Sequence, residues 1–146
     1  MGALVDTSVL IDVERRAHGS RTAFGPLLAA SLEDAVDADE EVAIAAITAS
    51  ELLHGVHRAT AEHRSRREAF VEAVLDAFPT VPFDLRSARI HARIWADLAA
   101  SGGEVGVHDR LIAASALSLG WRLVTANLRH FTSIAGLGVI ELRRPV

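Results

Sequence analysis

The side chains best suited to chemistry in this sequence are three carboxylates and one amide: Asp6, Glu51, Asp109 and Asn127. Each stands at the expected carboxyl end of a strand or in the first turn of the following helix. In an open parallel sheet, residues far apart in sequence converge at that edge, where ligands bind. Three converging carboxylates repel one another unless a cation joins them. The set therefore predicts a divalent metal site, and its hard oxygen ligands favour Mg²⁺ or Mn²⁺.

Each of these four residues also has an ordinary structural role open to it, at the start of a helix. Asp6 is a suitable cap for the first helix, and Asn127 is a good N-cap residue. Thr48 and Glu51 match a capping box, in which the glutamate bonds back to the threonine amide. Asp109 can oppose a helix dipole. Taken singly, each of these roles competes well with metal binding, but four coincidences at one sheet edge favour the metal site.

Strand-like and helix-like segments alternate along the chain, a pattern typical of right-handed βαβ crossovers in a parallel sheet. We expect strands at 3–5, 42–45, 80–83, 122–125 and 139–142. We expect helices at 8–16, 25–36, 48–58, 61–78, 85–101, 107–119 and 128–133. Pro82 places the third strand at or near a sheet edge. The sequence predicts one α/β domain over residues 1–146, with three α/β/α layers and a mainly parallel sheet of about five strands.

The helix expected at 85–101 carries an apolar stripe. At spacings of three and four, the stripe consists of Leu85, Ala88, Ala92, Trp95 and Ala99. Residues at these spacings share one face of a helix, so we expect the stripe to face the core. Gly102 and Gly103 end this helix, and Gly120 suits a left-handed cap after the next one.

The composition excludes several classes of protein. The chain has 146 residues, half of them hydrophobic, which suits a single domain with its own core. The absence of cysteine excludes a disulfide framework, a thiolate nucleophile and a cysteine zinc site. We find no membrane span and no signal peptide, so we expect a cytoplasmic protein. The net charge of -4 argues against a generally basic surface for nucleic acid but leaves room for a local one.

Four segments carry a resemblance to a known family. They read LVDTSVLID at 4–12, TASELLHGV at 48–56, VGVHDRLIAASAL at 105–117 and LVTANLRHF at 123–131. In order and spacing they resemble the motifs of PIN-domain nucleases, in particular VapC-type toxins. The resemblance covers nearly the whole chain. It is specific because the run that begins at His108-Asp109 occurs together with Asp6-Thr7-Ser8 in a domain of this length.

This resemblance implies an endoribonuclease selective for single strands, in which Asp6, Glu51 and Asp109 bind Mg²⁺ or Mn²⁺ and Asn127 supports the metal or a water. It also implies a homodimer that a small VapB-type antitoxin inhibits in a toxin–antitoxin hetero-oligomer. The chain departs from the pattern at two positions. Glu104 stands where many such toxins have a basic residue, which argues against a phosphate contact there. The amide at 127 replaces a fourth acidic residue, so a fully occupied two-metal site is less expected.

The chemistry that these residues support is hydrolysis of a phosphodiester by metal-activated water, without a covalent intermediate. Thr7 and Ser8 are close enough to Asp6 in sequence to orient a water or a phosphate oxygen, although both also suit helix initiation. His108 is placed to contact substrate or metal, but such a histidine is more often only a hydrogen-bond partner. The arginines that could contact the RNA backbone are Arg15, Arg16, Arg110 and Arg129, and a local basic cluster consists of Arg58, Arg64, Arg66 and Arg67. A solvated helix face explains that cluster equally well.

Rival functions differ in how well the sequence fits them. An aspartyl-phosphate phosphatase requires a second aspartate two residues after Asp6 and a lysine, but position 8 is serine and the chain has no lysine. A dinucleotide-binding domain requires a glycine-rich G-x-G-x-x-G turn after the first strand, which is missing. A catalytically weak PIN-like module that only binds RNA or protein stays open as the alternative. A missing carboxylate would favour it, and none of the three is missing.

The helices expected at 25–36, 48–58 and 61–78 are rich in Ala, Leu and Val. They carry more apolar residues than one core contact requires. We therefore expect the antitoxin to lie in an apolar groove on these helices and to place a basic side chain near the carboxylates. Packing in a dimer is the other explanation. The sequence does not specify which RNA is cut.

Overall fold

The computed structural model describes residues 1–142, apart from the side chain of Arg21, so the end of the expected domain at 143–146 lies outside the described residues. Five strands form one sheet in the order β3-β2-β1-β4-β5, and all pairs are parallel. The strands are β1 (Gly2–Val5), β2 (Glu41–Ala45), β3 (Thr80–Val81), β4 (Arg122–Thr125) and β5 (Val139–Glu141). The predicted α/β class with a parallel sheet is confirmed. The strand order reverses between β1 and β4, and such a switch point leaves a crevice at the carboxyl ends of the strands.

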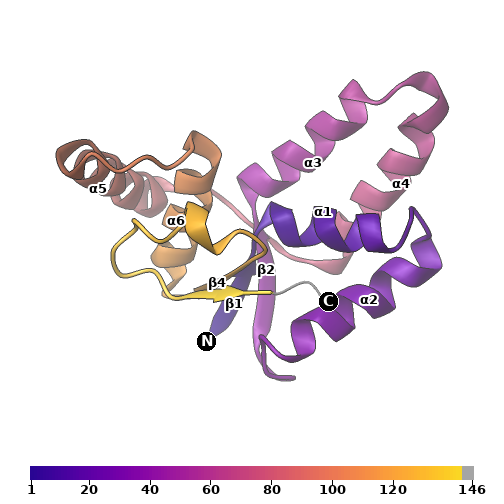
Figure 1. Cartoon of the computed structure of the whole chain (residues 1–146), viewed down its shortest axis with the longest axis horizontal. Helices are drawn as coiled ribbons and strands as arrows, with labels where there is room; N and C mark the ends of the chain where they lie inside the picture. The colour runs from indigo at the N-terminus through magenta and orange to yellow at the C-terminus, as the bar shows by residue number, and fades with distance from the viewer. Residues whose placement is uncertain (143–146) are drawn as a thin grey trace.

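Helices cover both faces of the sheet (Figure 1). They are α1 (Thr7–Arg16), α2 (Arg21–Glu33), α3 (Ala46–Arg58), α4 (Ala61–Ala77), α5 (Leu85–Ser101) and α6 (Val107–Leu119), with a 3₁₀ helix η1 (Leu128–His130). Side chains alternate along a strand, so Ala3 and Val5 pack with α1, α2 and α4, whereas Leu4 packs with α5 and α6. No helix within residues 1–142 is both long enough and apolar enough to cross a bilayer.

The start of α2 differs from the prediction because a core contact outweighs local sequence signals. From the sequence, we expect this helix to start at 25, but α2 begins at Arg21, and the Ser20 hydroxyl accepts a bond from the Ala23 backbone N–H at 3.3 Å. The added turn buries Phe24, whose ring meets that of Phe70 edge-on at 4.9 Å. After β4, the observed helix is shorter than predicted: η1 spans three residues instead of the expected 128–133.

The expected core stripe of α5 is wrong. Leu85 is 67% exposed and Trp95 is 58% exposed. The helix instead buries the neighbouring face, which carries Ser87, Ile94 and Leu98 and packs against α6. This face also repeats at helical spacing, and its branched aliphatic side chains fill the core better than the alanines of the predicted stripe.

Candidate active site

A pocket of about 330 Å³ opens at the carboxyl edge of the sheet. It is lined by all four residues that the sequence singled out, Asp6, Glu51, Asp109 and Asn127, and also by Thr7, Ser8, Asp12, Arg15 and His130. Asp6 follows β1, Asn127 follows β4, and the other two predicted residues lie in α3 and α6. The fold therefore brings the predicted carboxylates and the amide into one place, next to the switch point of the sheet.

Asp6 is the most firmly held of the three carboxylates. It is only 4% exposed, and its Oδ2 accepts bonds from the Ser8 hydroxyl at 2.6 Å and the Thr125 hydroxyl at 2.8 Å. Within residues 1–142, its Oδ1 accepts no hydrogen bond. Asp6 occupies the N-cap position of α1, but its side chain makes no capping bond. The predicted role as a side-chain cap is therefore wrong, and one carboxylate oxygen is left to face a ligand.

Glu51 is oriented by partners from two other helices. Its Oε1 accepts a bond from the Thr7 hydroxyl at 2.8 Å, and its Oε2 lies 3.4 Å from Nδ1 of His108. The Thr7 hydroxyl also lies 3.0 Å from that of Thr48. The expected capping box is wrong, because α3 begins at Ala46 and encloses Thr48, which is fully buried. The Glu51 carboxylate thus belongs to the pocket and not to the end of its own helix.

Asp109 lies in the first turn of α6, and its Oδ2 is 3.2 Å from Nδ1 of His130. Burial raises the pKa of Asp109 above its usual value, and the negative charge of Asp6 raises it further. Glu51 acts in the same direction, whereas His130 lowers the pKa. Asp6 and Glu51 are therefore close enough to Asp109 to disfavour its negative charge, which is an electrostatic condition that a cation relieves.

Asn127 lies at the pocket rim on the turn after β4, and its side chain is exposed. Its backbone N–H donates to the Thr125 hydroxyl at 3.0 Å. The predicted N-cap role is wrong, because the Asn127 side chain makes no capping bond to η1. The Leu128 N–H donates instead to Oε2 of Glu141 in β5, at 3.0 Å. The amide side chain of Asn127 is thus not used in the local turn.

The two predicted residues Arg110 and Arg129 do not line this pocket. Arg110 donates to the Val105 carbonyl at 2.9 Å, and its guanidinium lies 5.4 Å from the centre of the Trp95 ring. Arg16, also considered from the sequence, pairs with Asp12 at 3.4 Å. None of Arg16, Arg110 and Arg129 therefore lines the pocket.

Two residues that contact the carboxylates were missed by the sequence reasoning: Thr125, which bonds to Asp6 from outside the pocket lining, and His130, which lines the pocket. Thr125 is fully buried, and its hydroxyl links the end of β4 to Asp6. The signal was present, because a polar residue closing a buried apolar strand has to find a partner. His130 stands three residues after Asn127, a spacing that returns to the same side of a 3₁₀ turn.

The donor set fits a hard divalent cation, although the side chains are not yet closed around one. Among residues 1–142, no three His, Asp or Glu side chains surround a common point where an ion could be held. The reason is visible in the contacts, since Glu51 is turned to His108 and Asp109 to His130. Both carboxylates are partly exposed, and a cation would remove the repulsion that opposes their approach. An all-oxygen set of this kind suits Mg²⁺ or Mn²⁺.

Comparisons with known proteins match almost the whole chain. The PIN domain family model matches residues 3–137. Ribonuclease VapC1 of Rickettsia felis is 34% identical, over 97% of each chain. tRNA(fMet)-specific endonuclease VapC of Salmonella typhimurium is 35% identical, over 66% of this chain and 71% of that protein. A crystal structure of VapBC-5 from Mycobacterium tuberculosis, a member of the VapBC family of toxin–antitoxin systems, matches with 30% identity and a TM-score of 0.69, over 99% of this chain and 100% of that chain. The chain therefore belongs to the PIN-domain family and, within it, to the VapC ribonucleases.

Proposed function

We propose that this protein is a Mg²⁺- or Mn²⁺-dependent endoribonuclease that hydrolyses phosphodiesters of single-stranded RNA and acts as a VapC-type toxin. The observation that carries the proposal is that Asp6, Glu51 and Asp109, from three separate elements, line one pocket. The raised pKa of Asp109 adds support: burial is its main cause, and the charges of Asp6 and Glu51, which a metal ion would offset, raise it further. The names of the relatives support the nuclease activity.

In this mechanism, Asp6, Glu51 and Asp109 would hold the cation, and the Asn127 amide would support it or a water. A divalent cation in this place neutralises charge on the phosphate and lowers the pKa of the attacking water. Ser8 is no nucleophile, since its hydroxyl donates to Asp6 and accepts a bond from the Ala126 amide at 3.0 Å. It braces the carboxylate instead, so water attacks the phosphorus directly.

The test is cleavage of a labelled single-stranded RNA by the purified chain, with Mg²⁺, with Mn²⁺ and with a chelator. We expect cleavage only with a metal, and much slower cleavage of the same sequence in a duplex. Undiminished cleavage by metal-free protein would contradict the proposal. RNA binding without cleavage under all metal conditions would favour the alternative of a catalytically weak PIN-like binding module. Sequencing the new RNA ends after brief induction in cells would identify the substrate among transfer, ribosomal and messenger RNA.

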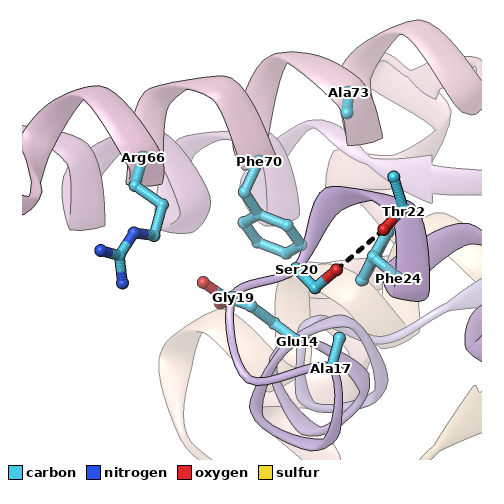
Figure 2. A pocket seen from close by; sticks show the side chains of 9 residues that line it. All are labelled: Glu14, Ala17, Gly19, Ser20, Thr22, Phe24, Arg66, Phe70 and Ala73. Atoms are coloured by element: carbon cyan, nitrogen blue, oxygen red, sulfur yellow. Dashed lines mark hydrogen bonds between the residues drawn. The ribbon is translucent and has the colours of Figure 1, made fainter.

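We also propose a VapB-type antitoxin as partner, supported by the relatives that are named as toxin–antitoxin complexes. An apolar pocket of about 480 Å³ lies between the end of α1, the start of α2 and α4, and Figure 2 shows Phe24 and Phe70 in its wall. It is the groove that suits an apolar antitoxin segment. Helix α3 contributes no residue to this pocket, so the part expected of helix 48–58 in antitoxin binding stays a prediction.

A growth experiment tests the antitoxin proposal. Expression of the chain alone should arrest growth, and co-expression of a small open reading frame next to its gene should restore it. Ala73→Glu, at a half-buried position in the pocket wall, should weaken capture of the antitoxin, whereas Ala77→Glu, at an exposed position one turn further along α4, serves as the matched control. Harmless expression of folded and active protein would count against the toxin assignment.

We further propose that residues 1–146 form one nuclease domain, that it acts in the cytoplasm, and that two copies form a homodimer. The large apolar side chains on the surface around α5 support the dimer: Phe83, Leu85, Trp95 and Val107. Light scattering should give twice the chain mass, and Trp95→Glu should shift it toward the monomer.

A further inference from the structure

A second hollow, of about 750 Å³, lies beside the acidic pocket, between the last turns of α1 and α3 and the first turns of α4. We call it the basic groove because its charged lining is mainly cationic. It is lined by the guanidinium groups of Arg15, Arg58, Arg66 and Arg67, by the imidazoles of His18 and His63, and by the carboxylates of Glu14 and Glu51. In a chain with a net charge of -4, this is a local reversal of sign.

The arginines of the groove outnumber its carboxylates, and only one of the four arginines forms an ion pair within residues 1–142. Arg67 is paired with Glu14, whose Oε2 lies 2.7 Å from its Nη1. Within residues 1–142, Arg15, Arg58 and Arg66 form no ion pair with a carboxylate. Like charges held in one hollow repel one another and attract anions from solution. Guanidinium groups bind phosphate oxygens through paired hydrogen bonds, so the groove is chemically suited to a chain of phosphates.

The basic groove is continuous with the acidic pocket. Ile11, Arg15 and Glu51 line both. Helix α1 runs along the two, with Asp6 at its start and Arg15 in its last turn, which are about 13 Å apart at the usual rise of an α-helix. A polymer with one phosphate at the carboxylates therefore passes Arg15 and enters the groove within a few nucleotides.

We propose that the basic groove binds the sugar-phosphate backbone of the RNA strand on one side of the bond that is cut. This site rests on the proposed nuclease function and extends it to a defined path for the substrate. Apart from the two imidazoles, no aromatic ring lines the groove. Its contacts therefore reach the backbone and not the base faces, so they increase affinity without reading sequence.

An acidic segment of a protein partner is the competing occupant of this groove. Such a segment would have to run toward Glu51 and Asp109, whose charges repel it. RNA also meets these carboxylates, but there the proposed metal ion offsets the repulsion between phosphate and protein. The continuity of the two hollows thus favours RNA over an acidic peptide.

The experiment compares two double variants of equal charge. Arg58→Gln with Arg66→Gln removes two of the four arginine charges from the groove. Arg89→Gln with Arg93→Gln removes the same charge from the exposed face of α5. Binding of a labelled single-stranded RNA is measured by fluorescence anisotropy over a range of salt concentrations, in the presence of a chelator so that no cleavage interferes. The groove variant should bind the RNA at least about tenfold more weakly. Its negative slope of log K against log salt should become shallower by about 1.4, or about 0.7 for each lost phosphate contact. The α5 variant should keep the wild-type slope.

A conservative variant and a short substrate sharpen the test. Arg58→Lys with Arg66→Lys keeps both charges and should restore the slope. In cleavage assays, the groove variant should have a raised KM for a long strand with kcat unchanged, and wild-type kinetics on a dinucleotide too short to reach the groove.

Three outcomes overturn the proposal. Equal losses in the groove and α5 variants would mean that only net charge matters. Arg66 also lines the apolar pocket, so antitoxin binding is compared with Arg58→Gln alone. Unchanged RNA binding with antitoxin binding weakened by Arg58→Gln would assign the groove to the protein partner, and unchanged binding of both would leave it a solvated surface. RNA binding is measured without cleavage, so the two proposals are tested separately. If the protein cuts no RNA, the proposed nuclease activity is wrong, but the binding data still show whether the groove binds RNA.

Discussion

The acidic pocket and the basic groove lie along the same helix, yet their charged groups are held in opposite ways. In the pocket, Asp6 is nearly buried, and two hydroxyls fix one of its oxygens. In the groove, Arg58 and Arg66 are exposed, and their side chains have no carboxylate partner among residues 1–142. Bond cleavage requires groups fixed to within a fraction of an ångström, whereas backbone binding tolerates mobile ones. The contrast supports the proposal that the pocket performs the chemistry and that the groove holds the substrate.

The largest effect is expected from Asp6→Asn. Asparagine keeps an oxygen that can accept the bonds from Ser8 and Thr125, but it is a poorer metal ligand. Activity should fall by more than about 100-fold, beyond the loss usual for residues that only support a ligand. The melting temperature without metal should hold or rise, because one of three repelling charges is gone. Asp76→Asn on the exposed face of α4 is the control, and wild-type cleavage by Asp6→Asn would remove the residue from the site.

A smaller loss is expected when the support of Asp6 is removed instead of Asp6 itself. Thr125→Val keeps the shape of the side chain but deletes the hydroxyl that donates to Asp6 and accepts a bond from the backbone N–H of Asn127. Metal affinity and activity should each fall about 10- to 100-fold. The free energy of unfolding should drop by about 1–3 kcal/mol, because an amide loses its partner. Thr125→Ser should recover most of both, and if Thr125→Val keeps full metal affinity in a Mn²⁺ titration, the pocket does not depend on this support.

Asn127→Asp should make the pocket more acidic and so sharpen its contrast with the groove. The added carboxylate lies at the pocket rim, so Mn²⁺ affinity should increase severalfold. The metal-free variant should be slightly less stable than wild type, since a fourth carboxylate joins the cluster. Calorimetric titration of both proteins measures the difference, and equal affinities would place residue 127 outside the metal site.

The smallest effect concerns Asp109 and pH in metal-free protein. Burial is the main reason why the pKa of Asp109 in the folded protein lies above its usual value. A carboxylate of this kind favours folding most below its unfolded pKa, and this contribution is lost as pH rises through the folded pKa. Asp109→Asn removes that loss, so at pH 7 the variant should melt slightly higher than wild type. The gap should close as the pH falls toward about 4, as followed by thermal melting with a chelator. A gap independent of pH would mean that the ionisation of Asp109 is not its source.

The convergence of the site could be predicted from the sequence because strand order and strand ends determine it. Apolar runs such as 3–5 and 122–125 are buried on both faces, so their assignment leaves little choice. Once these strands are parallel, Asp6 and Asn127 must lie at one edge. The capping roles were harder to exclude, because a residue such as Asp6 can occupy the N-cap position and still direct its side chain elsewhere.

Choices between equivalent local patterns could not be predicted from the sequence. The two stripes of α5 have the same spacing, and only packing against α6 decides that Ile94 is buried and Trp95 exposed. The start of α2 depends on Phe24 meeting Phe70, a residue far along the chain. The basic groove is of the same kind, because Arg15 and Arg66 come together only when α1 and α4 are in place.

Asp6, Glu51 and Asn127 follow the three middle strands of the sheet along the chain, and this placement has a consequence for hydrogen exchange. Fluctuations of a native protein open its edges and ends first, and here the edge strands β3 and β5 have only two and three residues. Amides around Asp6 should therefore exchange nearly as slowly as the global core, whereas the turn at Asn127, anchored to β5 through Glu141, should open more often. These openings leave the backbone that positions Asp6 intact, so we expect the free protein to remain able to bind a metal ion and RNA until another molecule fills the pocket.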